Sequence, residues 1–404
     1  MSADDTWRGE ARSGAAWFGH RVRALLPRGA DYRAMRIAPG RDLIAGITVG
    51  VVALPLALAF GITSGLGAAA GLITAIVAGT VAAVFGGSNL QISGPTGAMT
   101  VVLVPIVAEY GANGVLVVGL MAGLLLVVMA IAGLGRYVRF IPLPVIEGFT
   151  LGIAVIIALQ QVPSALGVDV SGEQVVIVAV KSVGQWVTSP QWVPVAIAAG
   201  VAGLMIVAAR LRIKPAVPVA LIAVVAATIV VQVADLDVAT IGALPSTLPL
   251  PSLPAFTFSD LRILIAPAVA VAALAALESL LSATVADAMS VSQRHDPDRE
   301  LFGQGLANVA SPLFGGIPAT AAIARTAVNV RSGAVSRLSA IVHSAVLLVV
   351  VLALSTVVGL IPLAALAGVL IATALRMVEV SSLRALLHSG RSDTLVLVIT
   401  FVAT

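Results

Sequence analysis

The chain has 404 residues, of which 59% are hydrophobic and only 10% charged, and its mean hydropathy is +1.08. Soluble domains carry roughly 25% charged residues, so this composition excludes a water-soluble globular surface and requires that most of the chain contact lipid or its own helices. The chain has no cysteine, which excludes disulfides, thiolate metal sites and cysteine nucleophiles.

The first 40 residues form a basic segment ahead of the first apolar stretch. They lack the apolar core of roughly 7–15 residues and the small-residue cleavage site of a signal peptide. We expect residues 1–40 to lie in the cytoplasm against the anionic leaflet. The arginines around this segment are Arg8, Arg12, Arg21, Arg23, Arg28, Arg33, Arg36 and Arg41.

The rest of the sequence reads as a series of membrane-spanning helices, each of which needs roughly 20 mostly apolar residues. Predicted spans lie at 43–62, 66–85, 94–109, 115–134, 142–163, 191–209, 215–234, 261–288, 302–314, 318–330, 338–358 and 361–378, and a thirteenth begins at Thr394. The spans at 94–109, 302–314 and 318–330 are short or interrupted by glycine. The predicted fold class is an all-α polytopic membrane protein.

Loop charges predict the orientation. Every second loop is basic, whereas the connector 235–260 carries acidic residues and no Lys or Arg. By the positive-inside rule the N-terminus is cytoplasmic, and we expect a multi-pass protein of the inner (plasma) membrane. The net charge of +4 therefore reports orientation rather than nucleic-acid binding. The basic loop residues are Arg136, Arg139, Arg210, Arg212, Lys214, Arg294, Arg299, Arg331, Arg337, Arg376, Arg384 and Arg391.

A tripeptide recurs in the two halves of the chain. Phe85-Gly86-Gly87 and Phe314-Gly315-Gly316 lie 229 residues apart, and each introduces a short span; at this offset Thr96 faces Arg325. The third and tenth spans are an odd number of spans apart, so the two units are predicted to be inverted copies, as in many secondary transporters. A chance match of a glycine-rich tripeptide is the alternative.

The repeat divides the chain into predicted units. The first inverted repeat, of seven helices, covers 41–234, and the extracytoplasmic connector covers 235–260. The second repeat covers 261–404 and lacks about its last two helices.

The third span begins with Gly94-Pro95-Thr96-Gly97, which reads as an unwound stretch leading into a helix. Proline suits the first helical position, and a helix N-terminus in a low-dielectric setting is an anion site. If the segment near Ala324 does the same from the opposite side, two helix N-termini converge on one spot. The alternative is that Gly and Pro only kink a helix.

Two charged residues lie deep in apolar runs, where charge is costly. Arg325, inside 317–330, either selects anions or is a structural or snorkelling arginine. Glu278, inside 262–286, either takes a proton or holds a cation, both of which are coupling mechanisms, or it pairs permanently with Arg325. Ser282 lies four residues after Glu278 and shares its helix face.

The sequence carries no catalytic motif. It lacks a Gly-x-Ser-x-Gly elbow, a His-Glu-x-x-His pair and a phosphate-binding loop. We therefore expect no enzyme and no cofactor, apart from H⁺ or Na⁺ as a coupling ion, and no metal site beyond a possible Na⁺ near Glu278 and Ser282.

These motifs resemble those of the SulP family of anion transporters. The resemblance rests on five stretches in family order: Arg41 to Pro55, Ser93 to Gly97, Glu278 to Ser282, Gly303 to Asn308 and Gly315 to Asn329. It implies fourteen helices as two inverted repeats of seven, sorted into a core and a gate domain, with the third and tenth helices meeting at the anion site. It also implies a homodimer.

The resemblance carries over to individual residues. The predicted substrate-binding residues are Phe60, Thr96, Gly97, Ala324, Arg325 and Thr326, and the predicted ion-coupling residues are Glu278, Ser282 and Ala322. Leu56 stands where the family often has glutamine, and we expect no STAS domain within these 404 residues. The run from Pro95 to Val102 looks like that of cyanobacterial bicarbonate transporters, whereas the run around Arg325 looks closer to bacterial dicarboxylate and sulfate members.

The predicted function is secondary active transport of a small anion (sulfate, bicarbonate or a C4-dicarboxylate) by alternating access, as a symport with H⁺ or Na⁺. An uncoupled anion channel or exchanger on the same fold is the alternative. A nucleobase permease is disfavoured by Arg325, because those substrates are mostly neutral. The expected partners are the anion, the lipid bilayer and a second copy of the chain, with no nucleic acid.

Overall fold

The computed structural model describes residues 19–140, 142–170, 172, 174–211, 217–290, 294–378 and 380–404. The first 18 residues of the predicted N-terminal segment, with Arg8 and Arg12, lie outside the described residues, as do Arg212 and Lys214. Within the described chain, eight helices are long and apolar enough to cross a membrane, and three shorter apolar helices accompany them. The predicted all-α polytopic architecture is confirmed.

The elements of the first half follow one another from the N-terminal segment to the connector. They are α2 (Gly29–Arg33), η1 (Ala34–Arg36), α3 (Pro39–Thr63), α4 (Ala68–Phe85), β1 (Ser93–Gly94), α5 (Gly97–Ile131), η2 (Gly135–Phe140), α6 (Leu143–Gln160), α7 (Val162–Leu166), α8 (Val175–Thr188), α9 (Trp192–Arg210) and α10 (Val219–Val233).

The second half repeats the order helix, helix, strand, helix that opens the first. Its elements are α11 (Phe258–Met289), α12 (Pro297–Leu313), β2 (Thr320–Ala321), α13 (Ile323–Arg331), α14 (Leu338–Gly359), α15 (Leu363–Met377), α16 (Val380–Ser389) and α17 (Arg391–Ala403).

Two predicted spans correspond to the two parts of α5. Helix α5 contains most of the spans predicted at 94–109 and 115–134, and a kink at Gly111, which has φ 68°, divides it into two helical stretches. Glycine adopts that conformation without the steric cost of a Cβ. Helix α8 was not predicted, because Lys181, Gln185 and Trp186 interrupt its apolar run and it has only 14 residues.

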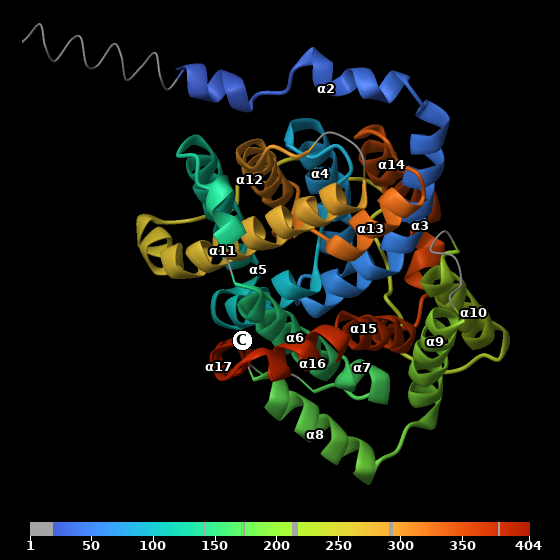
Figure 1. The fold of residues 1–404 in the computed structure, drawn as a ribbon. Helices are drawn as coiled ribbons and strands as arrows, with labels where there is room; N and C mark the ends of the chain where they lie inside the picture. The colour runs from blue at the N-terminus through green and yellow to red at the C-terminus, as the bar shows by residue number, and fades with distance from the viewer. Residues whose placement is uncertain are drawn as a thin grey trace, which may run out of the picture.

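The helices sort into two groups, each with members from both halves of the chain (Figure 1). Helices α3, α4, α5, α11, α12, α13 and α14 pack against one another and form the core group. Helices α6 to α10 and α15 to α17 form the gate group, which lies below the core group in Figure 1. The groups meet where α3 contacts α10 and α15 and where α5 contacts α6. The predicted division into core and gate domains is thus confirmed.

Three connections join the two groups in the described chain, and the last is short. Only three residues separate α14 from α15. The connector pairs with this link: Ile241 N–H donates to Ile361 O at 3.0 Å, and Leu363 N–H donates to Ala239 O at 2.9 Å. An isolated antiparallel bridge joins Thr240 to Pro362.

Glycines allow α3 and α4 to pack closely. A Cβ on Gly71 would collide with the carbonyl oxygen of Ala57, and a Cβ on Gly61 would lie 2.5 Å from the carbonyl oxygen of Gly67. Small residues at such crossings are typical of membrane helix packing. The close crossing lies at the end of α3 and the start of α4.

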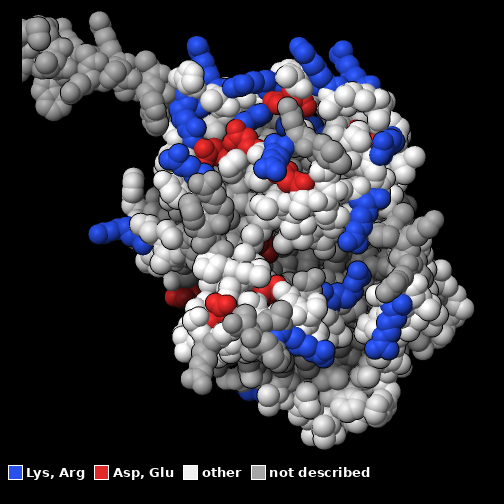
Figure 2. Space-filling model, in the orientation of Figure 1, with Lys and Arg blue, Asp and Glu red and all other residues white. Residues whose placement is uncertain are grey.

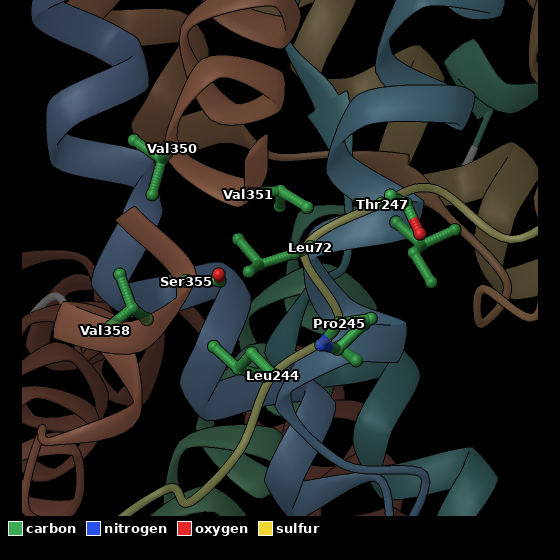
Figure 3. Close-up of a pocket in the computed structure, with 10 residues that line it drawn as sticks. Leu72, Leu244, Pro245, Thr247, Val350, Val351, Ser355 and Val358 are labelled. Atoms are coloured by element: carbon green, nitrogen blue, oxygen red, sulfur yellow. The ribbon is translucent and has the colours of Figure 1, made fainter. Parts of the chain in front are cut away.

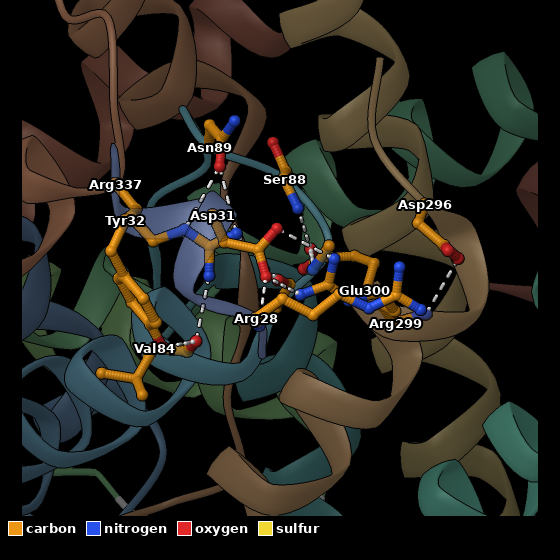
Figure 4. A network of polar contacts seen from close by, with 12 residues as sticks. Arg28, Asp31, Tyr32, Val84, Ser88, Asn89, Asp296, Arg299, Glu300 and Arg337 are labelled. Carbon is orange, nitrogen blue, oxygen red and sulfur yellow. Dashed lines mark hydrogen bonds and ion pairs between the residues drawn. The ribbon is translucent and has the colours of Figure 1, made fainter. Parts of the chain in front are cut away.

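The N-terminal segment lies across one end of the core group and is held there by ion pairs. Asp31 accepts hydrogen bonds from both terminal nitrogens of Arg299, at 3.2 and 2.6 Å, and Arg21 pairs with Asp298 at 2.6 Å. The hydroxyl of Tyr32 donates to Val84 O at 3.0 Å. Figure 4 shows Asp31 and Tyr32 reaching α12 and the end of α4.

The buried Arg337 closes the end of α4 from the other side. Its guanidinium donates to the carbonyl oxygens of Ala83, Val84 and Gly86 and to Asn89 Oδ1, at 2.9 to 3.3 Å. The last carbonyls of a helix lack partners within the helix, so this arginine caps α4. Its Cζ also lies 5.4 Å from the centroid of the Tyr32 ring.

Figure 2 shows Lys and Arg at the end that carries α2, and others along the side and over the lower part of this face. Three loops that the sequence places in the cytoplasm contribute to the contacts at this end. Arg299 and Arg337 contact the N-terminal segment, and Gly135 N–H donates to Asp298 at 3.0 Å. This common location agrees with the alternation of basic loops along the sequence.

Replacing Asp31 with Asn is expected to loosen the N-terminal segment. Burial raises the pKa of Asp31, but hydrogen bonds from Arg299 and from the Arg28 amide, with the charge of Arg299, outweigh it and hold the pKa below the ordinary 3.8. The stabilisation is therefore present above about pH 4 and is lost as the pH falls through the folded-state pKa. Loss of the pair should cost about 1 kcal/mol, seen as roughly fivefold faster hydrogen exchange over residues 29–36.

Arg36→Gln is the control, because Arg36 is exposed in the same segment. Unchanged exchange in Asp31→Asn would mean that the ion pair does not hold the segment.

Candidate functional site

Two short strands meet at the centre of the core group. Ser93 and Gly94 pair antiparallel with Ala321 and Thr320, in the register Ser93↔Ala321 and Gly94↔Thr320, and all four residues are buried. We call this pair the central ribbon. Gly94 has φ 153°, and a Cβ there would lie 2.7 Å from Arg325 Nη1. The ribbon brings the starts of α5 and α13 to one place, as the inverted repeat predicted, although the sequence did not predict the strand pairing.

Helix α5 begins at Gly97 with Thr96 as its N-cap. The Thr96 hydroxyl accepts from Met99 N–H at 3.4 Å and donates to Glu278 Oε2 at 2.8 Å. Thr96 is extended, as an N-cap residue should be. The prediction that Pro95 takes the first helical position was wrong, because Pro95 precedes the cap. Pro95 therefore does not start the helix, and its carbonyl oxygen accepts a hydrogen bond from Arg325.

Glu278 joins the two strand ends from α11. Its Oε2 accepts from Thr96 at 2.8 Å and from Thr320 at 2.9 Å. The next residue, Ser279, accepts from Ala321 N–H at 3.2 Å through its hydroxyl. Glu278 itself is partly exposed. The carboxylate thus contacts both inverted units through hydroxyl groups, and Thr320 is a partner that the sequence did not identify.

Arg325 lies in the first turn of α13 and is 2% exposed. Its Nη2 donates to Pro95 O at 2.8 Å, across the ribbon, whereas Nη1 has no hydrogen-bond partner. The ion pairs of the described residues do not join it to Glu278, so the permanent bridge considered from the sequence is not present. A buried guanidinium without a carboxylate is costly, and it leaves a positive charge at the meeting point of the two helix starts.

The start of α13 differs from the start of α5. Ala322 is its N-cap and supplies no side-chain hydrogen bond, while its own amide donates to Ile92 O at 3.0 Å. The first-turn amides therefore remain open to a ligand. Ala324 is exposed. The tripeptide offset aligned Thr96 with Arg325, but the helix starts align Thr96 with Ala322, three residues earlier.

Two residues predicted for the site lie behind the ribbon instead. The Ser282 hydroxyl donates to Thr326 Oγ1 at 3.0 Å, and Thr326 also accepts from Ile92 N–H at 3.1 Å. Both side chains are fully buried. Their contacts fasten α11 and α13 to the ribbon, so the predicted cluster of Ser282 with Glu278 is not formed by a hydrogen bond in this structure.

An apolar wall faces the start of α5. A Cβ on Gly97 would collide with Ile157 of α6 and would lie 3.2 Å from Phe60 Cε1. Phe60 was predicted from the family resemblance. Ile157, which is 1% exposed, was not, because an apolar residue in an apolar helix carries no sequence signal. The gate group therefore contacts the core group directly at the candidate site.

A separate cavity lies away from this site, between α4, α14 and the connector (Figure 3). Its lining includes Leu72, Leu244 and Val351, with Ser355 and Thr247 as the polar members. No charged residue lines it, so its chemistry does not suit an anion. Among the described residues, no three His, Asp, Glu or Cys side chains gather in a way that could hold a metal ion.

Comparison with known proteins identifies the family of the chain. The model of the sulfate permease family matches residues 40–400. A putative sulfate transporter of Bacillus subtilis, YvdB, is 42% identical over 374 residues, which are 90% of this chain and 69% of the relative. The bicarbonate transporter BicA of a Picosynechococcus strain is 34% identical over 358 residues, which are 85% of this chain and 62% of the relative.

A solved structure agrees with these relatives. The transmembrane domain of a cyanobacterial bicarbonate transporter BicA matches with a TM-score of 0.84 at 32% identity, over 92% of this chain and 95% of that domain. The relatives are transporters rather than enzymes. The chain belongs to the sulfate permease (SulP) family of membrane anion transporters.

Proposed function

We propose that the chain carries a small anion across the membrane by alternating access, driven by H⁺ or Na⁺. The observation that carries the proposal is Arg325, a buried guanidinium that forms no direct ion pair with a carboxylate among the described residues. It extends from the first turn of α13 to Pro95, just before α5. An anion there would meet the arginine charge and the open amides at the start of α13.

The relatives and the charge of the site support the proposed substrate class. The relatives include a putative sulfate transporter and a bicarbonate transporter, and a full guanidinium suits a sulfate, a bicarbonate or a C4-dicarboxylate. Phe60 and Gly97 shape the apolar side of the site. We infer that Thr96 reaches the anion only when it releases Glu278.

Glu278 supplies the coupling in this proposal. The same hydroxyl of Thr96 caps α5 and holds Glu278, so a proton or Na⁺ taken up by the carboxylate would alter the start of α5. This shared contact joins the ion and the anion energetically, as coupling requires. The protein is further proposed to be a homodimer of the plasma membrane with a cytoplasmic N-terminus.

Replacing Arg325 is expected to remove anion binding. Arg325→Ala should raise the KM for uptake by at least about tenfold, and Arg325→Lys should give an intermediate loss because lysine lacks the planar fork that reaches Pro95. The measurement is tracer uptake of sulfate, bicarbonate and fumarate by the full-length protein in proteoliposomes. Arg331→Lys, at the exposed end of the same helix, is the control and should retain the wild-type KM. Wild-type KM in Arg325→Ala would overturn the assigned role.

Replacing Glu278 with Gln is expected to uncouple transport. Uptake is measured under a proton gradient, a sodium gradient or neither. Glutamine keeps an oxygen for Thr96 and Thr320 but cannot change its charge, so gradient-driven accumulation should disappear while anion exchange persists. Asp287→Asn on the same helix is the control, since Asp287 accepts from His295 at 2.8 Å and lies outside the site. Wild-type uptake that only equilibrates, unchanged in Glu278→Gln, would instead support the uncoupled channel or exchanger.

The proposed orientation can be tested directly because the chain has no cysteine. Leu250→Cys, on the exposed connector, should react with a membrane-impermeant thiol reagent in intact cells. Gly29→Cys, at the start of α2 with open space around it, should react only after lysis. The reverse pattern would place the N-terminus outside.

A further inference from the structure

His343 is a buried imidazole to which the proposed function gives no role. It lies on α14 and is 1% exposed, and neither Nδ1 nor Nε2 has a hydrogen-bond partner. The Nη1 of Arg325 is also buried and without a partner. Buried polar groups are nearly always hydrogen-bonded to protein or to ordered water, and an unpaired one costs roughly 1–3 kcal/mol. The guanidinium on α13 and the imidazole on α14 could both be satisfied by one shared hydrogen-bond partner.

Both groups lie along the same strip of α4 and β1. A Cβ on Gly94 would lie 2.7 Å from Arg325 Nη1 and 3.3 Å from the Cα of Ala75. One turn further along α4, a Cβ on Gly79 would lie 3.9 Å from His343 Cε1 and 3.3 Å from Ser93 O. Ser93 and Gly94 are consecutive.

The chemistry of the two groups suits a water molecule as a shared partner. The guanidinium only donates hydrogen bonds, and a neutral imidazole offers one acceptor nitrogen. The two side chains do not bond directly. A water molecule can accept from Nη1 and donate to the ring nitrogen, with the carbonyl oxygen of Ser93 nearby as a further acceptor. Buried waters typically have two to four such partners.

We propose that a buried water molecule bridges Arg325 Nη1 to an unprotonated ring nitrogen of His343, and that this bridge fixes the guanidinium from the side of α4. His343 is then a positioning residue, which acts on the anion through Arg325. Among the described residues, the guanidinium donates a direct hydrogen bond only to Pro95 O, so the bridge supplies a second hydrogen bond that fixes its orientation. The role of His343 in transport rests on the proposed function of Arg325; the bridge itself does not.

The test compares His343→Leu with His343→Gln in the full-length protein. Leucine fills similar space without an acceptor, and it should raise the KM for anion uptake by about three- to tenfold, the size expected for one hydrogen bond. Glutamine keeps an acceptor, and its KM should stay within about twofold of the wild type. Ser344→Ala is the matched control, because the adjacent Ser344 donates to Ala75 O at 3.2 Å, and its KM should not change.

The outcomes distinguish loss of the water bridge from loss of side-chain packing as the cause of a changed KM. A wild-type KM in His343→Leu, with an equal or higher Tm, would mean that the ring nitrogens are truly unpaired and would overturn the bridge. An equal loss in the Leu and Gln variants would assign the effect to packing and would also overturn it.

A second measurement does not depend on transport. An experimental density map of the wild-type protein at about 2 Å resolution should show density for a water molecule between Arg325 Nη1 and His343. Absence of that density would overturn the bridge even if the variants fail to fold. If the wild type takes up none of the anions, the proposed function fails while this density still decides the bridge.

Discussion

The pairing of two strands of two residues each is the constraint on which the site depends. Ser93 and Gly94 satisfy their backbone groups against Thr320 and Ala321, so the chain can leave helical geometry at membrane depth without exposing polar groups to lipid. The pairing also sets where α5 and α13 begin. Thr96, Glu278 and Arg325 meet because each lies within a few residues of the ribbon or bonds to it.

Charge at the site is arranged without an internal ion pair. Glu278 is held by two hydroxyls and Arg325 by a carbonyl oxygen, so the two groups are not hydrogen-bonded to each other. A direct ion pair would satisfy both groups and would leave little electrostatic attraction for a ligand. The separation costs stability in the empty site, and such a cost is consistent with groups retained for binding rather than for folding.

Much of the architecture could be predicted from the sequence, because apolar length and loop charge report spans directly. The repeated tripeptide located the two unwound segments, and the cost of burying Arg325 and Glu278 marked them as site residues. The rest needed the structure. A strand of two residues is too short to leave a period in the sequence, so the ribbon was not predicted, and the tripeptide offset misplaced the start of α13 by three residues. Ser282 and Thr326 have the same polarity whether they face a ligand or the ribbon, and Ile157 has no distinguishing chemistry at all.

The three-residue link between α14 and α15 has a mechanical consequence. The connector at 239–242 is hydrogen-bonded to residues in and beside this link, so the end of α14 and the start of α15 are held together at this point. The other two connections are longer. At Ile361 the two groups can therefore separate by no more than the length that three residues span.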